Sequence, residues 1–195
     1  MFPILNWFFV FLILITSTSL MLFRDWRWVL GSLALQYVGV FWLTLIHWPL
    51  SMAAVKLVTG WMSCTILGMV LLYFEDDPDA ELTWPQSRFF HLAAALVIWV
   101  VSLTLAFRVA AWLGIDISVT LGGLILMGNG MLMLGMTTQP LRVVIGLLVL
   151  LSGFEIIYAA IENSALVAAL LTIVTLGLAL TGAYLMTPQV EEKPE

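Results

Sequence analysis

Long apolar segments, separated by short polar interruptions, run along almost the whole chain. Each contains about the 20 residues that a helix needs to cross the hydrocarbon core of a bilayer, and they cover residues 3–23, 27–46, 49–73, 89–113, 117–136, 140–161 and 164–186. The breaks at His47-Trp48-Pro49 and Glu162-Asn163-Ser164 are so short that they predict tight hairpins. The pattern predicts an all-α integral membrane protein with seven transmembrane helices.

The composition agrees with this prediction. The chain has 195 residues, of which 63% are hydrophobic and 10% charged, and a water-soluble domain of this length could not bury so much apolar surface. Its formal net charge of -5 comes largely from acidic residues in segment 75–81 and in the C-terminal tail, and nothing in the sequence indicates nucleic-acid binding. The first segment lacks a basic start and a small-residue cleavage site, so we interpret it as an uncleaved span.

The polar segment 75–91 is the one sizeable predicted loop, and the fourth helix follows it. With this helix included, we divide the chain into a four-helix N-terminal membrane region (1–116, including the loop 75–91), a three-helix region (117–187) and a tail (188–195). Most basic residues fall on one side of the predicted membrane: Arg24, Arg27, Arg88, Arg142 and Lys193. Because cytoplasmic loops are enriched in Lys and Arg, we expect the N-terminus outside and the C-terminus in the cytoplasm.

Three ionisable residues lie inside predicted spans: Lys56, Arg108 and Glu155. A charge at the centre of a helix in lipid costs roughly 2.5–3.5 kcal/mol on insertion scales, so each requires a physical reason. Glu155 lies about 22 Å from the cytoplasmic end of its helix. Glu162 follows seven residues later on the same face, near the outer surface.

Each of these charges has more than one interpretation. Glu155 is either a proton-relay carboxyl or a protonated group hydrogen-bonded to a neighbouring helix. Lys56 extends toward the interface, forms a structural ion pair or belongs to a charge relay, whereas Arg108 is close enough to the interface to reach it. Because Lys56 and Arg108 have similar depth, both are candidates to face Glu155. Glu162 is typical of a solvated helix end.

Other polar groups in mid-span are candidates for interhelical hydrogen bonds: Gln36, Tyr37, Asn129, Thr172 and Thr175. A polar path beside Glu155 and Lys56 could include Glu162, Thr172, Thr175, Asn129 and Arg108. Glycines crowd segment 117–136 and indicate close helix approach or a local distortion of the helix. The single cysteine, Cys64, has no neighbouring ligand pattern, and the sequence contains no phosphate-binding loop, nucleophile motif or zinc motif. We therefore expect no cofactor, no metal site and no self-contained active site.

The last three segments, GLILMGNGMLMLGMTTQPLRVVIGLLVLLSGFEIIYAAIEN and SALVAALLTIVTLGLALTGAYL, resemble a known module. They are similar to the three-helix K subunit of NADH-quinone oxidoreductase (respiratory complex I) and to the C subunit of Mrp-type cation/proton antiporters. The likeness consists of a first helix opening with GLIL and ending at the basic turn TTQPLR, the Gly153-Phe154-Glu155-Ile156 segment, and the small-residue run LGLAL.

By this resemblance Glu155 matches the family's glutamate in the middle helix, part of a polar axis through the membrane arm. The family's second glutamate would fall near Ile173, where Thr172 and Thr175 are the nearest polar residues. A K-like module preceded by extra helices, one of which carries a lysine, is similar to the long E-type membrane subunits of group 4 hydrogenases. Lys56 is the residue carried over from that likeness.

The resemblance implies a non-catalytic membrane subunit that packs between larger antiporter-like subunits and contributes to a proton or cation path. The complex would lie in the inner (plasma) membrane of a prokaryote or in another energy-transducing membrane, and redox chemistry would belong to other subunits. Two alternatives stay open. The chain is a purely structural assembly subunit of such a complex, or it is an independent small multi-span transporter.

Overall fold

The computed structural model describes residues 3–23, 25–73 and 88–187, and all regular structure in these ranges is helical. Its seven helices are long and apolar enough to cross a membrane. They are α1 (Pro3–Leu22), α2 (Trp26–Leu45), α3 (Leu50–Tyr73), α4 (Arg88–Leu113), α5 (Ile117–Met136), α6 (Pro140–Ile161) and α7 (Ala165–Met186). The predicted boundaries are confirmed to within one residue. Most of the predicted loop 75–91 and the tail 188–195 lie outside the described residues.

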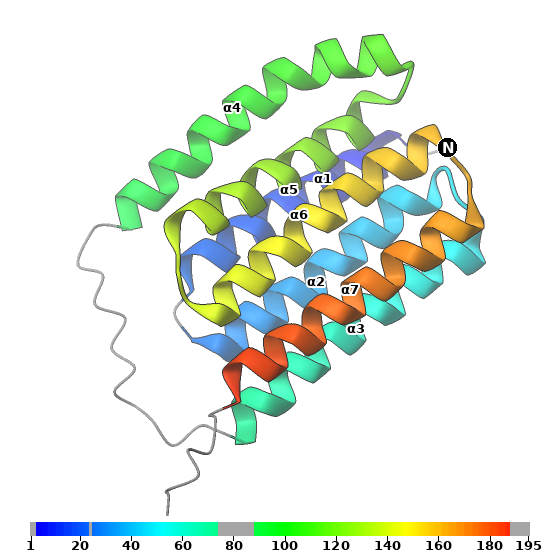
Figure 1. The fold of residues 1–195 in the computed structure, drawn as a ribbon. Helices are drawn as coiled ribbons and strands as arrows, with labels where there is room; N and C mark the ends of the chain where they lie inside the picture. Colours follow the sequence, from blue (N-terminus) through cyan, green and yellow to red (C-terminus); the bar gives the residue numbers. More distant parts are fainter. Residues whose placement is uncertain (1–2, 24, 74–87, 188–195) are drawn as a thin grey trace, which may run out of the picture.

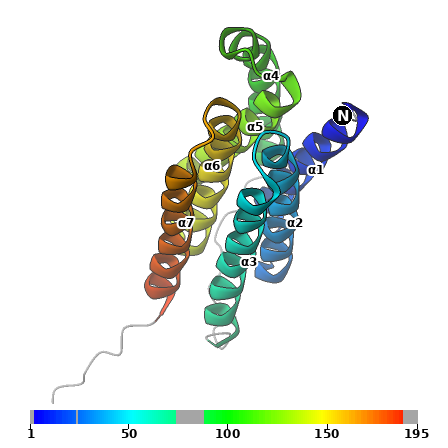
Figure 2. The same cartoon turned by 90° about the vertical axis from the view of Figure 1, so that its right-hand side faces the viewer.

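The helices form two rows of three with α4 at one side (Figures 1 and 2). One row is α1, α2 and α3, and the other is α5, α6 and α7. The rows pack helix against helix, α1 on α5, α2 on α6 and α3 on α7. The predicted N-terminal region therefore supplies the first row and α4, and the predicted three-helix region supplies the second row.

The connections 46–49, 114–116 and 162–164 share one end of the bundle, which we call the hairpin end. Residues with fixed local roles mark several of the turns. The Asp25 carboxylate accepts a hydrogen bond from Arg27 N (3.0 Å) at the start of α2, and Pro140 occupies the first turn of α6. Gly114 ends α4 with a φ of +68°, a conformation that costs glycine little. These signals explain why the sequence predicts the boundaries so closely.

Glycines bring α5 and α6 into backbone contact, as the crowding of glycine in segment 117–136 predicts. A Cβ atom placed on Gly130 would lie 2.7 Å from Leu150 N, and one on Gly153 would lie 2.6 Å from Gly123 O. Both distances are too short for a carbon atom. By contrast, Gly135, near the end of α5, has nothing within 4 Å of that position.

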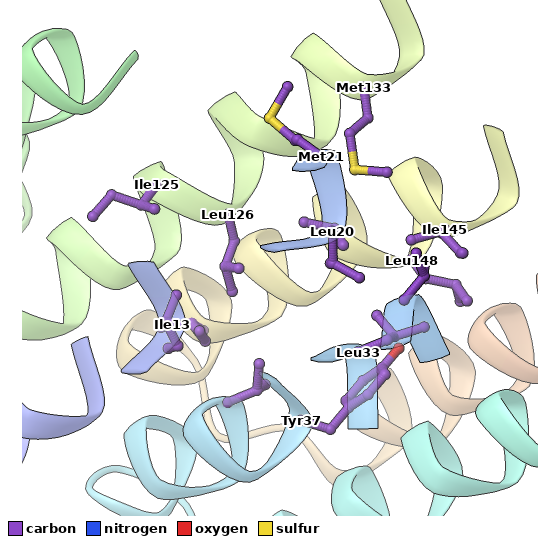
Figure 3. Close-up of a cluster of buried hydrophobic side chains, with 14 of the residues drawn as sticks. Ile13, Leu20, Met21, Leu33, Tyr37, Ile125, Leu126, Met133, Ile145 and Leu148 are labelled. Carbon is purple, nitrogen blue, oxygen red and sulfur yellow. The ribbon is translucent and has the colours of Figure 1, made fainter. Parts of the chain in front are cut away.

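Apolar side chains fill the space between the two rows. The cluster in Figure 3 combines side chains of α1, α2, α5 and α6. They are Ile13, Leu20 and Met21 of α1, Leu33 and Tyr37 of α2, Ile125, Leu126 and Met133 of α5, and Ile145 and Leu148 of α6. All of them are buried. The centre of the bundle is therefore apolar.

Helix α4 lies at the edge of the bundle, where it packs mainly on α5 and also contacts α1. Gly128 of α5 receives the side chain of Ile98, since a Cβ at this glycine would lie 2.6 Å from Ile98 Cγ2. Arg108 is exposed on this helix. The structure thus leaves Arg108 outside the space between the rows.

Candidate functional site

Lys56 and Glu155 form an ion pair between the two rows. Lys56 Nζ donates a hydrogen bond to Glu155 Oε1, and the two side chains are only 2% and 1% exposed. Lys56 Nζ also lies 3.4 Å from Thr175 Oγ1, an acceptor on α7. The pair therefore connects α3 with α6 and α7. The sequence left three alternatives for Lys56: extension toward the interface, a structural ion pair, or a charge relay. Extension toward the interface is wrong, because the side chain is buried and bonded to Glu155.

The two partners meet because their positions in the helices match. Lys56 lies six residues after Leu50, where α3 starts, and Glu155 lies six residues before Ile161, where α6 ends. Since both ends are at the hairpin end, each residue is about 9 Å inside the bundle. Gly60, one turn below Lys56, leaves room for the Tyr37 ring, which a side chain at this position would strike. Tyr37 thus closes the site on the side of α2.

The threonines predicted for the polar path have different surroundings. The Thr175 hydroxyl donates to Leu171 O (2.8 Å) and is buried, so it offers its lone pairs to Lys56. Thr172 is half-buried and donates to Ala168 O (2.9 Å) within its own helix. Ile173, near the position where the resemblance would put a second glutamate, is 65% exposed and points away from the pair. Thr175 is therefore the threonine that belongs to the site.

The other predicted residues do not join this pair. Glu162 is exposed at the C-terminal end of α6, as expected for a solvated helix end. Asn129 is buried on α5, and its side-chain nitrogen donates to Ser17 Oγ of α1 at 2.7 Å. Arg108 is on α4, away from the facing rows. The structure brings together Lys56, Glu155 and Thr175, and leaves these three residues apart from them.

Trp48, which sequence reasoning did not identify, covers the ion pair at the hairpin end. It is buried against Ala159 and Ala168, with Met52 and Tyr158 beside them. Met52 precedes Lys56 by one turn and Ala159 follows Glu155 by one turn, so this apolar cluster lies between the pair and the hairpin connections. The indole N–H of Trp48 donates to the Glu162 carbonyl oxygen (3.1 Å). One hairpin is thereby attached to the other.

A Trp48→Phe substitution tests this attachment. It keeps an aromatic ring in the apolar cluster and removes the hydrogen bond to Glu162 O, so we expect the free energy of unfolding to fall by about 0.5–1.5 kcal/mol. Denaturant unfolding in mixed micelles measures the change. Trp61→Phe is the matched control, since the indole of Trp61 bonds Ala34 O (3.2 Å) at an exposed position. An equal loss in both variants would contradict a specific role for the buried bond.

The chemistry available at this site is proton transfer. Lys56 and Glu155 share a direct hydrogen bond, so the charged pair differs from the neutral pair only by the position of one proton. The described residues contain no group of three or more His, Cys, Asp or Glu side chains that could hold a metal ion. Comparisons with models of known families, with curated proteins and with solved structures find no match for this chain.

Proposed function

We propose that the chain is a non-catalytic membrane subunit of a complex I-like, Mrp-like or group 4 hydrogenase-like assembly, in which Glu155 and Lys56 form part of a proton or cation path. The observation that carries this proposal is the ion pair buried between the rows. Ionisable groups inside a membrane are costly, and they commonly mark proton relays or ion pathways. The resemblance of residues 123–185 to K-type subunits supports the same assignment, because Glu155 matches the glutamate of that family.

The proposed orientation follows from the basic residues. With the N-terminus outside and the C-terminus in the cytoplasm, the hairpin end faces outward and Arg27 and Arg142 face the cytoplasm. The pair then lies in the outer half of the inner (plasma) membrane of a prokaryote, or of another energy-transducing membrane. Larger antiporter-like subunits would flank the chain, and redox chemistry would take place in other subunits.

A structural role for the same pair is the second candidate. The hydrogen bonds of Lys56 connect α3 with α6 and α7, and this connection would stabilise an assembly subunit without any proton movement. A third candidate, an independent transporter, would purify in mild detergent as a stable homo-oligomer without large partners. Identification of the proteins that co-purify with the chain distinguishes the third candidate from the other two.

Glu155→Gln in the intact complex distinguishes a relay from a structural pair. Glutamine keeps the shape and a hydrogen-bond acceptor for Lys56, but it cannot take up and release a proton. We expect translocation of protons or sodium to be lost while the subunit remains in the complex. Translocation by membrane vesicles and the subunit composition of the purified complex are the two measurements.

Glu162→Gln is the matched control, because this exposed carboxyl is seven residues away on the same helix. Translocation in this variant should equal that of the unchanged complex. Normal assembly with unchanged translocation in Glu155→Gln would sink the relay role and leave the structural one.

A further inference from the structure

A second group of buried polar side chains lies between α1, α2 and α5. Gln36 of α2 is 1% exposed and Asn129 of α5 is 0% exposed. Neither amide atom of Gln36 has a hydrogen-bond partner within the described part of the chain, and Asn129 Oδ1 has none either. Leaving a buried amide group without a partner costs roughly 1–3 kcal/mol. These atoms therefore need a partner that the described residues do not supply.

Helix geometry places the two amides at the same level of the bundle. A Cβ on Gly122 of α5 would lie 2.6 Å from Leu43 Cδ1 of α2, so the Leu43 side chain reaches α5 at this level. Seven residues make two helical turns, so residues seven apart lie on the same face of a helix. Helix α2 ends at the hairpin end and α5 starts there. Moving two turns away from that end therefore leads from Leu43 back to Gln36 on α2, and from Gly122 forward to Asn129 on α5.

Helix α1 closes the third side of this space. Ile13 of α1 lies near the level of Gly122, since its Cδ1 would lie 3.8 Å from a Cβ on that glycine. Ser17, one turn further along α1, is fully buried and accepts the hydrogen bond from Asn129 Nδ2. The Ser17 hydroxyl itself donates to Leu14 O (3.3 Å). Ser17 thus holds the side-chain nitrogen of Asn129, while Asn129 Oδ1 has no hydrogen-bond partner among the described residues.

Apolar layers enclose the polar one along the bundle axis. Toward the hairpin end lie Ile13 and Leu126, and toward the other end lie Leu20, Leu33 and Met133 (Figure 3). This polar layer is therefore shut off from bulk solvent.

We infer that at least one bound water molecule bridges Gln36 and Asn129 in this layer. The unpaired atoms comprise two acceptors, Gln36 Oε1 and Asn129 Oδ1, and one donor group, Gln36 Nε2. Water matches such a mixed set because it donates and accepts, and buried waters typically make two to four hydrogen bonds. A cation would meet the amide hydrogens of Gln36, which disfavour it. This site is independent of the proposed function, since Lys56 and Glu155 take no part in it.

Water-edited solid-state NMR on the full chain in lipid bilayers detects the bound water directly. The side-chain amide signals of Gln36 and Asn129 are assigned by their loss in Gln36→Leu and Asn129→Leu. We expect magnetisation to reach the Gln36 amide from water as fast as it reaches Gln139, which is half-buried at the start of α6. Transfer as slow as that to the backbone amide of Leu126, in the apolar core, would overturn the inference.

A thermal double-mutant cycle tests whether the two amides share the site. Each leucine substitution alone should lower the melting temperature by several degrees because it leaves the other amide unsatisfied, and the double variant should lose less than the sum. Thr44→Val is the control on α2, because Thr44 is buried but bonds its own helix at Val40 O (3.0 Å). It should show no coupling to Asn129. Additive losses for Gln36 and Asn129, or coupling without transfer from water, would reject a water bridge.

Discussion

A Glu155→Leu substitution is expected to lower the free energy of unfolding by about 3–5 kcal/mol, because it leaves the Lys56 ammonium buried without its partner. Lys56 of α3 is 2% exposed and bonds side chains of α6 and α7, so it cannot regain water without a rearrangement of the helices. Thr175 alone supplies a single acceptor at 3.4 Å. The penalty should therefore be among the largest of any single substitution in the chain.

Adding Lys56→Leu to this variant should recover most of the loss. Replacing both members of a buried pair with apolar residues is often neutral or stabilising, and both leucines would lie among hydrocarbon. Unfolding by denaturant in mixed micelles gives the coupling energy from the two single variants and the double variant. If the double variant were as unstable as the sum of the singles, the two charges would not interact in the folded protein.

Gly153→Ala should lower the free energy of unfolding by about 1–3 kcal/mol. The added methyl group would lie 2.6 Å from Gly123 O and 2.7 Å from Met127 N, and both are backbone atoms that move only if α5 and α6 separate. Because Glu155 is two residues away on α6, the separation should also disturb the ion pair. The same unfolding measurement checks the prediction.

Gly135→Ala is the matched control for this substitution. Gly135 is also helical and lies on the partner helix α5, but nothing is within 4 Å of its Cβ position. Alanine should leave stability unchanged or raise it by up to about 1 kcal/mol through its higher helix propensity. A comparable loss at Gly135 would mean that helix contact is not the cause at Gly153.

The seven helices could be predicted because apolar length, proline and capping residues act locally. Each span is apolar over its full length, and Pro49, Gly114, Asp116 and Pro140 mark breaks that need no tertiary information. Depth along each helix follows directly from these boundaries. For this reason the sequence placed Lys56, Arg108 and Glu155 at comparable levels.

The partner of Glu155 could not be selected from depth alone. Lys56 and Arg108 were both candidates, and the choice depends on which helix packs against α6 and on the face that it presents. When a span is apolar on all sides, its sequence gives little information about which side packs against the other helices. The position of Trp48 in its apolar cluster, and the common level of Gln36 and Asn129, depend on the same long-range packing. The sequence therefore indicated neither of them.

The separation of Lys56 and Glu155 along the chain has a consequence for biogenesis. The two residues are 99 positions apart, and at about 5–20 residues per second a ribosome needs roughly 5–20 s to make the intervening chain. During this interval α3 carries a lysine without its final partner. Since Lys56 is about 9 Å from the hairpin end, its side chain can reach the headgroups until α6 is inserted. The ion pair between the rows can therefore form only late in synthesis, after α6 has been made.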